Sequence, residues 1–159
     1  AIERVQKRTD ALLNCGGTHR PEWFHRKLGD ILYEGCGVAR DEAGLLDALT
    51  KVRELREEFW RDVKVVGTGN RLNQELEKAG RVADFIELGE VMILDALDRR
   101  ESAGAHFRNE YATEAGEAKR NDGDWCAVSA WETRPDGTKV RHSEPLSFSL
   151  IDLQVRDYR

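Results

Sequence analysis

Apolar residues recur at helical spacing from the start of the chain to about residue 103. The recurrence predicts helices over residues 2–14, from Pro21 to Gly35, from Asp41 through Phe59, and over about 72–102. Proline suits the first turn of a helix because its missing N–H costs nothing there, and an aspartate before the next helix can act as its N-cap. The Gly67-Thr68-Gly69 segment between the last two helices is predicted to be a turn.

The last of these helices is the longest, and its apolar residues repeat at roughly 3.5 positions, which is typical of bundle packing. At about 1.5 Å per residue, some 30 residues form a rod of roughly 45 Å, which needs long partners. We therefore expect the helix after Asp41 to lie antiparallel to it and the first two helices together to form the remaining leg. Residues 1–103 are predicted to be a mainly α unit, a three-helix, spectrin-repeat-like antiparallel bundle.

The pattern changes after a polar loop over residues 104–123. Apolar and polar residues alternate over 125–133, a Pro135-Asp136-Gly137 turn follows, and a second strand begins near Val140. A third strand is predicted over 146–150. Because a hairpin alone is marginally stable in water, we expect residues 124–159, a small antiparallel β-hairpin appendage, to pack on the bundle or on a domain outside this chain.

The chain has an acidic balance of charge. Its 159 residues include 25 Lys and Arg against 30 Asp and Glu, which gives a formal net charge of −5. Nucleic acids and anionic membranes are polyanions, and the basic residues are interspersed with acidic ones, so the charge disfavours both as general partners. No apolar run approaches the roughly 18 residues of a bilayer span, and the charged start lacks a signal peptide and indicates a chain that begins within a longer protein.

Four soft metal ligands lie in the first 36 residues, namely Cys15, His19, His25 and Cys36. Their spacing does not match a zinc knuckle, and the last two lie about three turns apart on one helix. Buried thiols and exposed imidazoles explain them better, so no metal site is predicted. The three cysteines are odd in number and widely spaced, which favours reduced thiols in a cytosolic setting over disulfides.

No catalytic or cofactor-binding residue is predicted from the sequence. The Gly67-Thr68-Gly69 turn lacks the preceding buried strand and the third glycine of a dinucleotide fingerprint. Cys36 has no partner base nearby in the sequence. The carboxylate pair Glu87 and Glu90 is attributed to the solvated face of a charged helix.

The densest polar cluster is the segment 99–111, where the longest helix ends. Cations at a helix C-terminus complement the helix dipole, so the presence of Arg99 and Arg100 has a purely structural explanation. The helix dipole does not explain the glutamate, serine, histidine and further arginine that follow. Two interpretations stay open, a helix-capping loop or an interdomain contact, and the candidate contact residues are Arg100, Glu101, Ser102, His106 and Arg108.

The same cluster carries a resemblance to a known family. Arg100-Glu101-Ser102-x-Gly104-x-His106 resembles a signature near the C-terminus of the flavoprotein subunit of succinate dehydrogenase and fumarate reductase, which the related L-aspartate oxidases share. Further segments that resemble the family are Phe107-Arg108-x-Glu110-Tyr111, His25-Arg26-Lys27-Leu28-Gly29, Gly37-Val38-Ala39-Arg40 and Glu144-Pro145-Leu146. Many members have arginine where this chain has Ala103, and the small residue there resembles one branch of the family.

The resemblance covers nearly the whole chain and implies a C-terminal fragment of such a subunit. In the family, this domain is a three-helix bundle beside the FAD-binding domain, and the subunit docks on an iron–sulfur subunit anchored to a membrane cytochrome. The resemblance thus implies FAD in the full-length subunit, none bound by this fragment, and succinate–fumarate interconversion by the whole enzyme. It also implies a place in the cytoplasm, at the inner face of a bacterial cell membrane.

The role implied for the fragment is structural: it is inactive alone, buttresses the FAD-binding domain and contributes subunit contacts. Arg100, Glu101 and His106 would then face that domain, and substituting all three would leave the melting temperature of the fragment nearly unchanged. Two alternatives remain. One is a free-standing helical protein-interaction module whose own bundle covers Trp125 and Trp131, and the other is a small metalloenzyme built on the four soft ligands.

Overall fold

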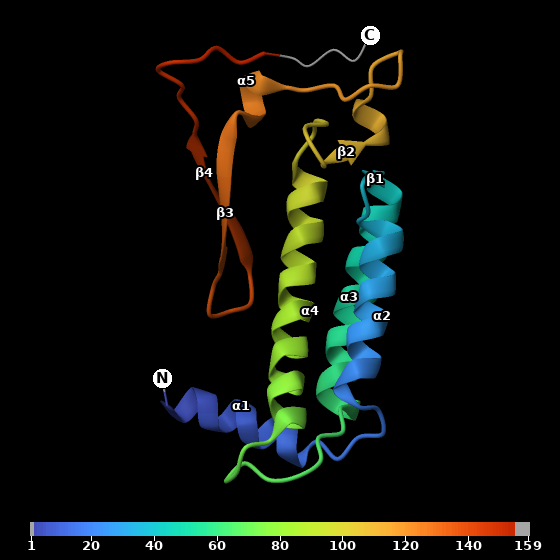
Figure 1. Ribbon diagram of the computed structural model, residues 1–159, viewed down its shortest axis with the longest axis vertical. Helices are drawn as coiled ribbons and strands as arrows, with labels where there is room; N and C mark the ends of the chain where they lie inside the picture. The colour runs from blue at the N-terminus through green and yellow to red at the C-terminus, as the bar shows by residue number, and fades with distance from the viewer. Residues whose placement is uncertain (1, 155–159) are drawn as a thin grey trace.

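The computed structural model describes residues 2–154 and is mainly helical (Figure 1). Three long helices, α2 (Pro21–Gly35), α3 (Glu42–Asp62) and α4 (Gln74–Asp98), lie side by side. Figure 1 shows α3 running opposite to α2 and α4, so the predicted three-helix antiparallel bundle is confirmed. Among the described residues, no helix combines the length and the apolar character that crossing a bilayer requires.

The first helix, α1 (Ile2–Asn14), does not extend the leg formed by α2, so the expected joining of these two helices into one leg is wrong. It crosses the lower end of the bundle beside the first half of α4, where Arg8 pairs with Asp84 at 2.6 Å. The turn after α1 explains this course. The Gly17 amide donates to the Val63 carbonyl at 3.2 Å, and a side chain at Gly17 would overlap the carbonyl of Asp62.

Side chains define where the long helices begin. Asp41 Oδ1 accepts from the Gly44 amide at 2.8 Å, which confirms the predicted N-cap of α3. Asn73 caps α4 in the same way, accepting from the Leu76 amide at 3.1 Å, so α4 begins at Gln74 rather than at 72. The side-chain amide of Asn73 also donates to two carbonyls of the preceding turn, which is the predicted helix connection.

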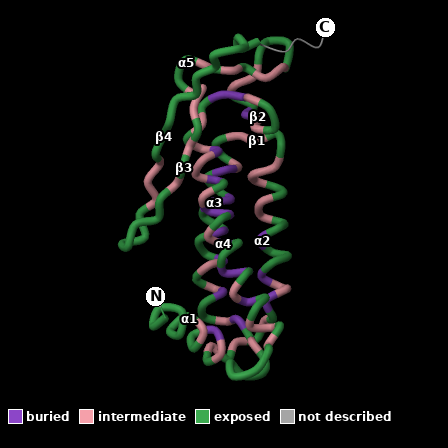
Figure 2. Tube along the Cα trace, turned by 60° about the vertical axis from the view of Figure 1, so that its left-hand side comes forward, coloured by how far each residue is buried: buried purple, intermediate pink, exposed green. Residues whose placement is uncertain are grey.

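The core fills the space between α2, α3 and α4, where Figure 2 shows most of the buried positions. Phe24 and Phe59 are fully buried and meet edge to face, with 5.2 Å between their ring centroids. The larger aliphatic side chains buried with them are Leu28, Leu45, Leu49, Val52, Leu55, Val82, Ile86 and Ile93. These are the positions that helical periodicity places on one face of each helix.

A short parallel pair closes the upper end of the bundle. It consists of β1 (Ala39–Arg40), between α2 and α3, and β2 (Phe107–Arg108), after α4 (Figure 1). A single 3-10 turn, η1 (Asn109–Tyr111), follows β2. Strands of two residues leave no periodicity in the sequence, so this pair was not predicted.

The predicted antiparallel hairpin is formed by β3 (Ala127–Thr133) and β4 (Lys139–Pro145). Three contacts tie it to α4. Trp131 Nε1 donates to Asp95 at 2.7 Å, Arg141 pairs with Asp98 at 2.7 Å, and Lys139 pairs with Glu87 at 2.9 Å. Of the two packing partners expected for the hairpin, this chain therefore provides the bundle.

Two details of this region differ from prediction. Trp125 lies in a helical turn, α5 (Asp122–Trp125), rather than in a strand. The expected third strand over 146–150 is also wrong, since these residues form no ladder. Pro145 has no N–H to donate, and after the bond from the Leu146 amide to the Cys126 carbonyl at 2.9 Å the chain leaves the hairpin.

Candidate functional site

The segment 99–111, called here the 99–111 loop, folds over the upper end of the bundle (Figure 1). Glu101 lies inside it with 2% of its surface exposed. Its Oε1 accepts from Nε and Nη2 of Arg99 at 2.8 and 2.6 Å, and its Oε2 accepts from the Asn121 amide at 2.7 Å. Charge-assisted bonds of this kind offset the cost of burying a carboxylate. Glu101 therefore joins the end of α4 to the segment before α5.

Ser102 and Arg108 form a second buried junction. The Ser102 hydroxyl accepts from the Arg108 amide at 2.8 Å and donates to the Arg108 carbonyl at 3.1 Å. Nη1 of Arg108 donates to the carbonyls of Ala96 at 2.8 Å and Leu97 at 3.3 Å. A helix leaves its last carbonyls without intrahelical partners, so Arg108 caps α4 and the helix ends at Asp98 rather than at about 102.

Arg108 also links the 99–111 loop to the start of α3. Its Nε donates to one carboxylate oxygen of Glu110 at 3.1 Å, and the other oxygen accepts from the Glu42 amide. Burial alone would raise the pKa of Glu110, but these hydrogen bonds outweigh it and hold the pKa below its ordinary value. A carboxylate at the N-terminus of α3 also complements the helix dipole.

His106 is half-buried and follows a tight turn at Gly104, whose φ of +59° favours glycine. Its Nε2 donates to the Arg99 carbonyl at 3.0 Å, which leaves Nδ1 as an acceptor. Burial lowers the pKa of His106, and the charges of Arg40, Arg99 and Arg108 lower it further. The ring is therefore neutral at pH 7.

Arg100 is the one candidate contact residue that the chain leaves exposed. Glu101, Ser102 and Arg108 are enclosed by the chain itself, contrary to the expectation that Glu101 faces another domain. The helix-capping interpretation accounts for these three side chains, because each bonds to another part of this chain. An interdomain contact stays a prediction for Arg100 and for the half-buried His106.

The four soft ligands near the start of the chain do not come together. Cys15 Sγ donates to the Trp60 carbonyl at 3.4 Å, and the His25 ring lies against Phe85. His19 and Cys36 have other partners, Asp62 and Arg40. Within residues 2–154, no group of three or more His, Cys, Asp or Glu side chains could hold a metal ion.

A hydrogen bond between His19 Nδ1 and the Asp62 carboxylate fastens the turn before α2 to the end of α3. The Asp62 carboxylate also accepts from the amide of Thr18 at 2.8 Å and from its hydroxyl at 2.7 Å. The bonds from His19 and Thr18 lower the pKa of Asp62 from an ordinary 3.8 to about 2. His19, one of the four ligands that the metal hypothesis required, is thus hydrogen-bonded to Asp62.

Glu90 is a buried polar residue that sequence reasoning missed. It is 3% exposed, so its placement on a solvated face is wrong. From α3, Arg53 Nε donates to one oxygen at 2.8 Å and Arg56 Nη1 donates to the other. Burial opposes ionisation, yet the two arginines outweigh it and lower the pKa of Glu90. The signal in the sequence was the three-residue spacing of the arginines, which puts both on one helix face.

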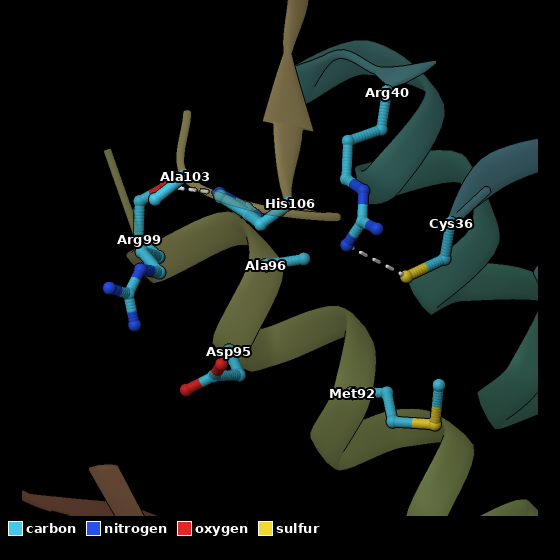
Figure 3. A pocket seen from close by; sticks show the side chains of 8 residues that line it. All are labelled: Cys36, Arg40, Met92, Asp95, Ala96, Arg99, Ala103 and His106. Atoms are coloured by element: carbon cyan, nitrogen blue, oxygen red, sulfur yellow. Dashed lines mark hydrogen bonds between the residues drawn. The ribbon is translucent and has the colours of Figure 1, made fainter. Parts of the chain in front are cut away.

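A cavity of about 390 Å³ opens between the segment from Cys36 to Arg40 after α2, the helix α4 and the 99–111 loop (Figure 3). Its lining residues are Cys36, Arg40, Met92, Asp95, Ala96, Arg99, Ala103 and His106. Burial raises the pKa of the Cys36 thiol, which makes it a poor nucleophile at neutral pH. The cavity thus joins the segment ending at Arg40 to the 99–111 loop, two segments that lie far apart in the sequence.

The described residues do not fit a flavin dinucleotide. Such a site needs a glycine-rich turn that follows a buried parallel strand and opens a helix, so that the helix N-terminus faces the pyrophosphate. The Gly67–Gly69 turn connects α3 to α4, and the two sheets of the described residues are a pair of two-residue strands and a hairpin.

Known proteins resemble this chain over most of its length. A family model described as fumarate reductase flavoprotein C-term matches residues 25–158. The succinate dehydrogenase flavoprotein subunit of Bacillus subtilis is 25% identical over 158 residues, which cover 99% of this chain and 26% of that protein. The fumarate reductase flavoprotein subunit of Escherichia coli is 31% identical over 104 residues, or 65% of this chain and 17% of its own length. The chain therefore spans about a quarter or less of these relatives.

Solved structures share the fold. Escherichia coli quinol fumarate reductase matches with a TM-score of 0.80 and 24% identity, over 95% of this chain and 25% of that one. Adenosine-5-phosphosulfate reductase matches with a TM-score of 0.75 and 17% identity, over 97% of this chain and 25% of that one. At these identities the likeness shows the fold alone. Because the family model runs from within α2 to beyond β4 and includes the 99–111 loop, the chain belongs to the family of fumarate reductase flavoprotein C-terminal domains.

Proposed function

We propose that this chain is the structural C-terminal domain of a FAD-dependent succinate dehydrogenase or fumarate reductase flavoprotein subunit, whose full-length form interconverts succinate and fumarate. The observation that carries the proposal is the family match over residues 25–158, in a chain that covers 26% of the Bacillus subtilis relative. Both relatives described above are named as flavoprotein subunits of such oxidoreductases. The redox chemistry belongs to the whole subunit.

FAD belongs, in this proposal, to the part of the subunit outside this chain. The support is the poor fit of the described residues to a dinucleotide, since the Gly67-Thr68-Gly69 turn connects two helices and follows no buried strand. No step of the reaction is assigned to residues of this chain, and the fragment alone is inactive.

The contact with the FAD-binding domain is proposed to involve the 99–111 loop. Glu101, Ser102 and Arg108 are buried and each is hydrogen-bonded to another part of the chain, so they hold the loop backbone in one arrangement. Arg100 projects from this support into solvent. A fixed loop with an exposed cation loses little conformational entropy on docking, which favours a stable contact.

The further partners proposed for the subunit are those of the family. The subunit docks on an iron–sulfur subunit, which a membrane cytochrome anchors, and this places the chain in the cytoplasm at the inner face of a bacterial membrane. The relatives named as flavoprotein subunits of succinate dehydrogenase and fumarate reductase support a place in a larger complex.

A free-standing helical interaction module is the competing proposal. The structure gives it one supporting observation, since Trp131 bonds to α4 and Trp125 lies beside Arg99 and Arg141 within this chain. The family match favours the domain of a larger subunit.

The gene and the complete subunit test the proposal together. We expect the reading frame to continue upstream by several hundred codons, and the purified complete subunit to contain FAD and to reduce a dye when succinate is added. A reading frame that starts at residue 1 would favour the free-standing module. A complete subunit without flavin would contradict the assignment to this enzyme class.

A further inference from the structure

The cavity beneath the 99–111 loop is lined by an arginine, Arg40, that forms no ion pair with a carboxylate among the described residues. Arg40 extends from β1 toward the hollow between α2 and α4 (Figure 3). Within residues 2–154, the partner of its side chain is the Cys36 thiol, 3.8 Å from Nη1, and its Nε is buried without any partner. Buried guanidinium donors nearly always have acceptors, because leaving one unpaired is costly.

The other polar groups of the cavity do not neutralise Arg40. The Asp95 carboxylate accepts from Trp131, and Arg99 is bound to Glu101. Figure 3 shows both side chains directed to the other side of α4 from Arg40. The Cys36 thiol and the His106 ring are uncharged at neutral pH, for the reasons given above. The cavity is therefore electropositive at Arg40.

We propose that this cavity is a receptor for a carboxylate group, which pairs with the guanidinium of Arg40. The guanidinium edge formed by Nε and Nη2, away from Cys36, has two parallel donors that match the two oxygens of a carboxylate. Nε is buried without an acceptor, so the proposed contact requires the Arg40 side chain to turn toward the cavity, where the carboxylate supplies the acceptor.

Two sources could provide the carboxylate. A cavity of about 390 Å³ has room for a free monocarboxylate with water, or for the end of an Asp or Glu side chain from a polypeptide segment that covers the opening. The chemistry at Arg40 is the same in both cases. The two sources differ in whether a free carboxylate still binds once the chain is part of a larger subunit.

Acetate is the probe for the 159-residue chain. We expect acetate to shift the NMR signal of the Arg40 Nε–H in a saturable way, while sodium chloride at equal ionic strength produces no saturable shift. Arg40→Gln should weaken acetate binding about tenfold or more, the worth of a hydrogen bond between charged groups. The matched control is Arg26→Gln, an exposed arginine on α2 that should bind acetate like the parent chain.

A second variant keeps the test valid if Arg40→Gln does not fold. Met92 is 47% exposed and lines the cavity, so Met92→Glu brings a carboxylate of the chain's own, and Met92→Gln is its uncharged match. We expect Met92→Glu to melt at a higher temperature than Met92→Gln at pH 7 and to lose its response to acetate. Equal melting temperatures with an unchanged response would contradict the proposal.

The complete subunit distinguishes the sources. Loss of the acetate response there, with melting weakened by Arg40→Gln, assigns the carboxylate to a side chain of the covering segment, and a retained response assigns it to a free anion. The proposal is overturned if acetate and chloride act alike on the 159-residue chain, or if Arg40→Gln responds like the parent. Because this arm uses the chain alone, its outcome is independent of the flavoprotein assignment.

Discussion

At the scale of single residues, Glu101 is the carboxylate that joins the end of α4 to the segment before α5. Glu101→Gln keeps the shape of the side chain but removes the charge from its bonds with Arg99. We expect this to lower the free energy of unfolding by about 1.5–3 kcal/mol, the range for hydrogen bonds to charged groups. Thermal melting of the 159-residue chain measures the loss. The sequence alone led to the opposite expectation, that substituting Glu101 together with Arg100 and His106 leaves the melting temperature nearly unchanged.

The matched control is Glu54→Gln, an exposed glutamate on α3, which should change stability by about 0.5 kcal/mol or less. If Glu101→Gln and Glu54→Gln melt alike, the buried network around Glu101 does not contribute to the stability of this chain.

Asp62 gives the chain a dependence on acidic pH. Its pKa is lowered from 3.8 to about 2 in the folded chain, so the hydrogen bonds to its carboxylate stabilise the fold above about pH 4. That stabilisation is lost as the pH falls toward 2. We expect Asp62→Asn to be less stable than the parent near pH 5 and the gap to close by about pH 2. Chemical unfolding across this range measures it.

Asp30→Asn is the control, because this exposed aspartate of α2 makes no ion pair among the described residues. A gap for Asp62→Asn that stays constant between pH 5 and pH 2 would show that the charge of Asp62 is not what fastens the turn before α2.

At the scale of elements, periodicity and capping residues predict the helices of the bundle. The end of α4 and the course of α1 depend instead on tertiary hydrogen bonds and contacts. Asp41 was identified as a cap from its residue type, and its bond to Gly44 bears this out. The end of α4 depends on Arg108, which lies ten residues beyond Asp98 and caps the helix. No local sequence pattern predicts this contact. The course of α1 depends in the same way on contacts of Gly17 with the far end of α3.

Gly17 and Gly29 form a matched pair that tests the contact between α1 and α3. A Cβ at Gly17 would overlap the Asp62 carbonyl, whereas a Cβ at Gly29, within α2, meets no atom within 4 Å. We expect Gly17→Ala to destabilise the chain by about 2 kcal/mol or more and Gly29→Ala to stabilise it by about 0.5–1 kcal/mol. Equal effects in chemical unfolding would contradict the close approach at Gly17.

The hairpin depends on its bond from Trp131 to α4. Trp131→Phe keeps an aromatic ring but removes the donor to Asp95, so we expect a loss of about 1 kcal/mol and faster amide exchange in β3 and β4. Trp60→Phe, at a half-exposed tryptophan of α3, is the control. Unchanged exchange in the hairpin of Trp131→Phe would show that other contacts hold it.

At the scale of the whole molecule, the bundle, the hairpin and the family could be predicted from the sequence, because each rests on a pattern or motif within one segment. The arrangement of the candidate site could not be predicted, because it depends on segments far apart in the chain. Arg40 and His106 line one cavity although more than sixty residues separate them, and the buried Glu90 is paired with Arg53 and Arg56 from α3.

The central claim is that this chain is a structural domain with its own core and without a flavin site. Visible absorbance of the purified 159-residue chain after addition of FAD and gel filtration tests it most directly, with the complete subunit as the positive control. We predict a folded chain with no flavin bound and no succinate-driven dye reduction. Retained flavin at one equivalent per chain, or dye reduction by the chain alone, would contradict the account.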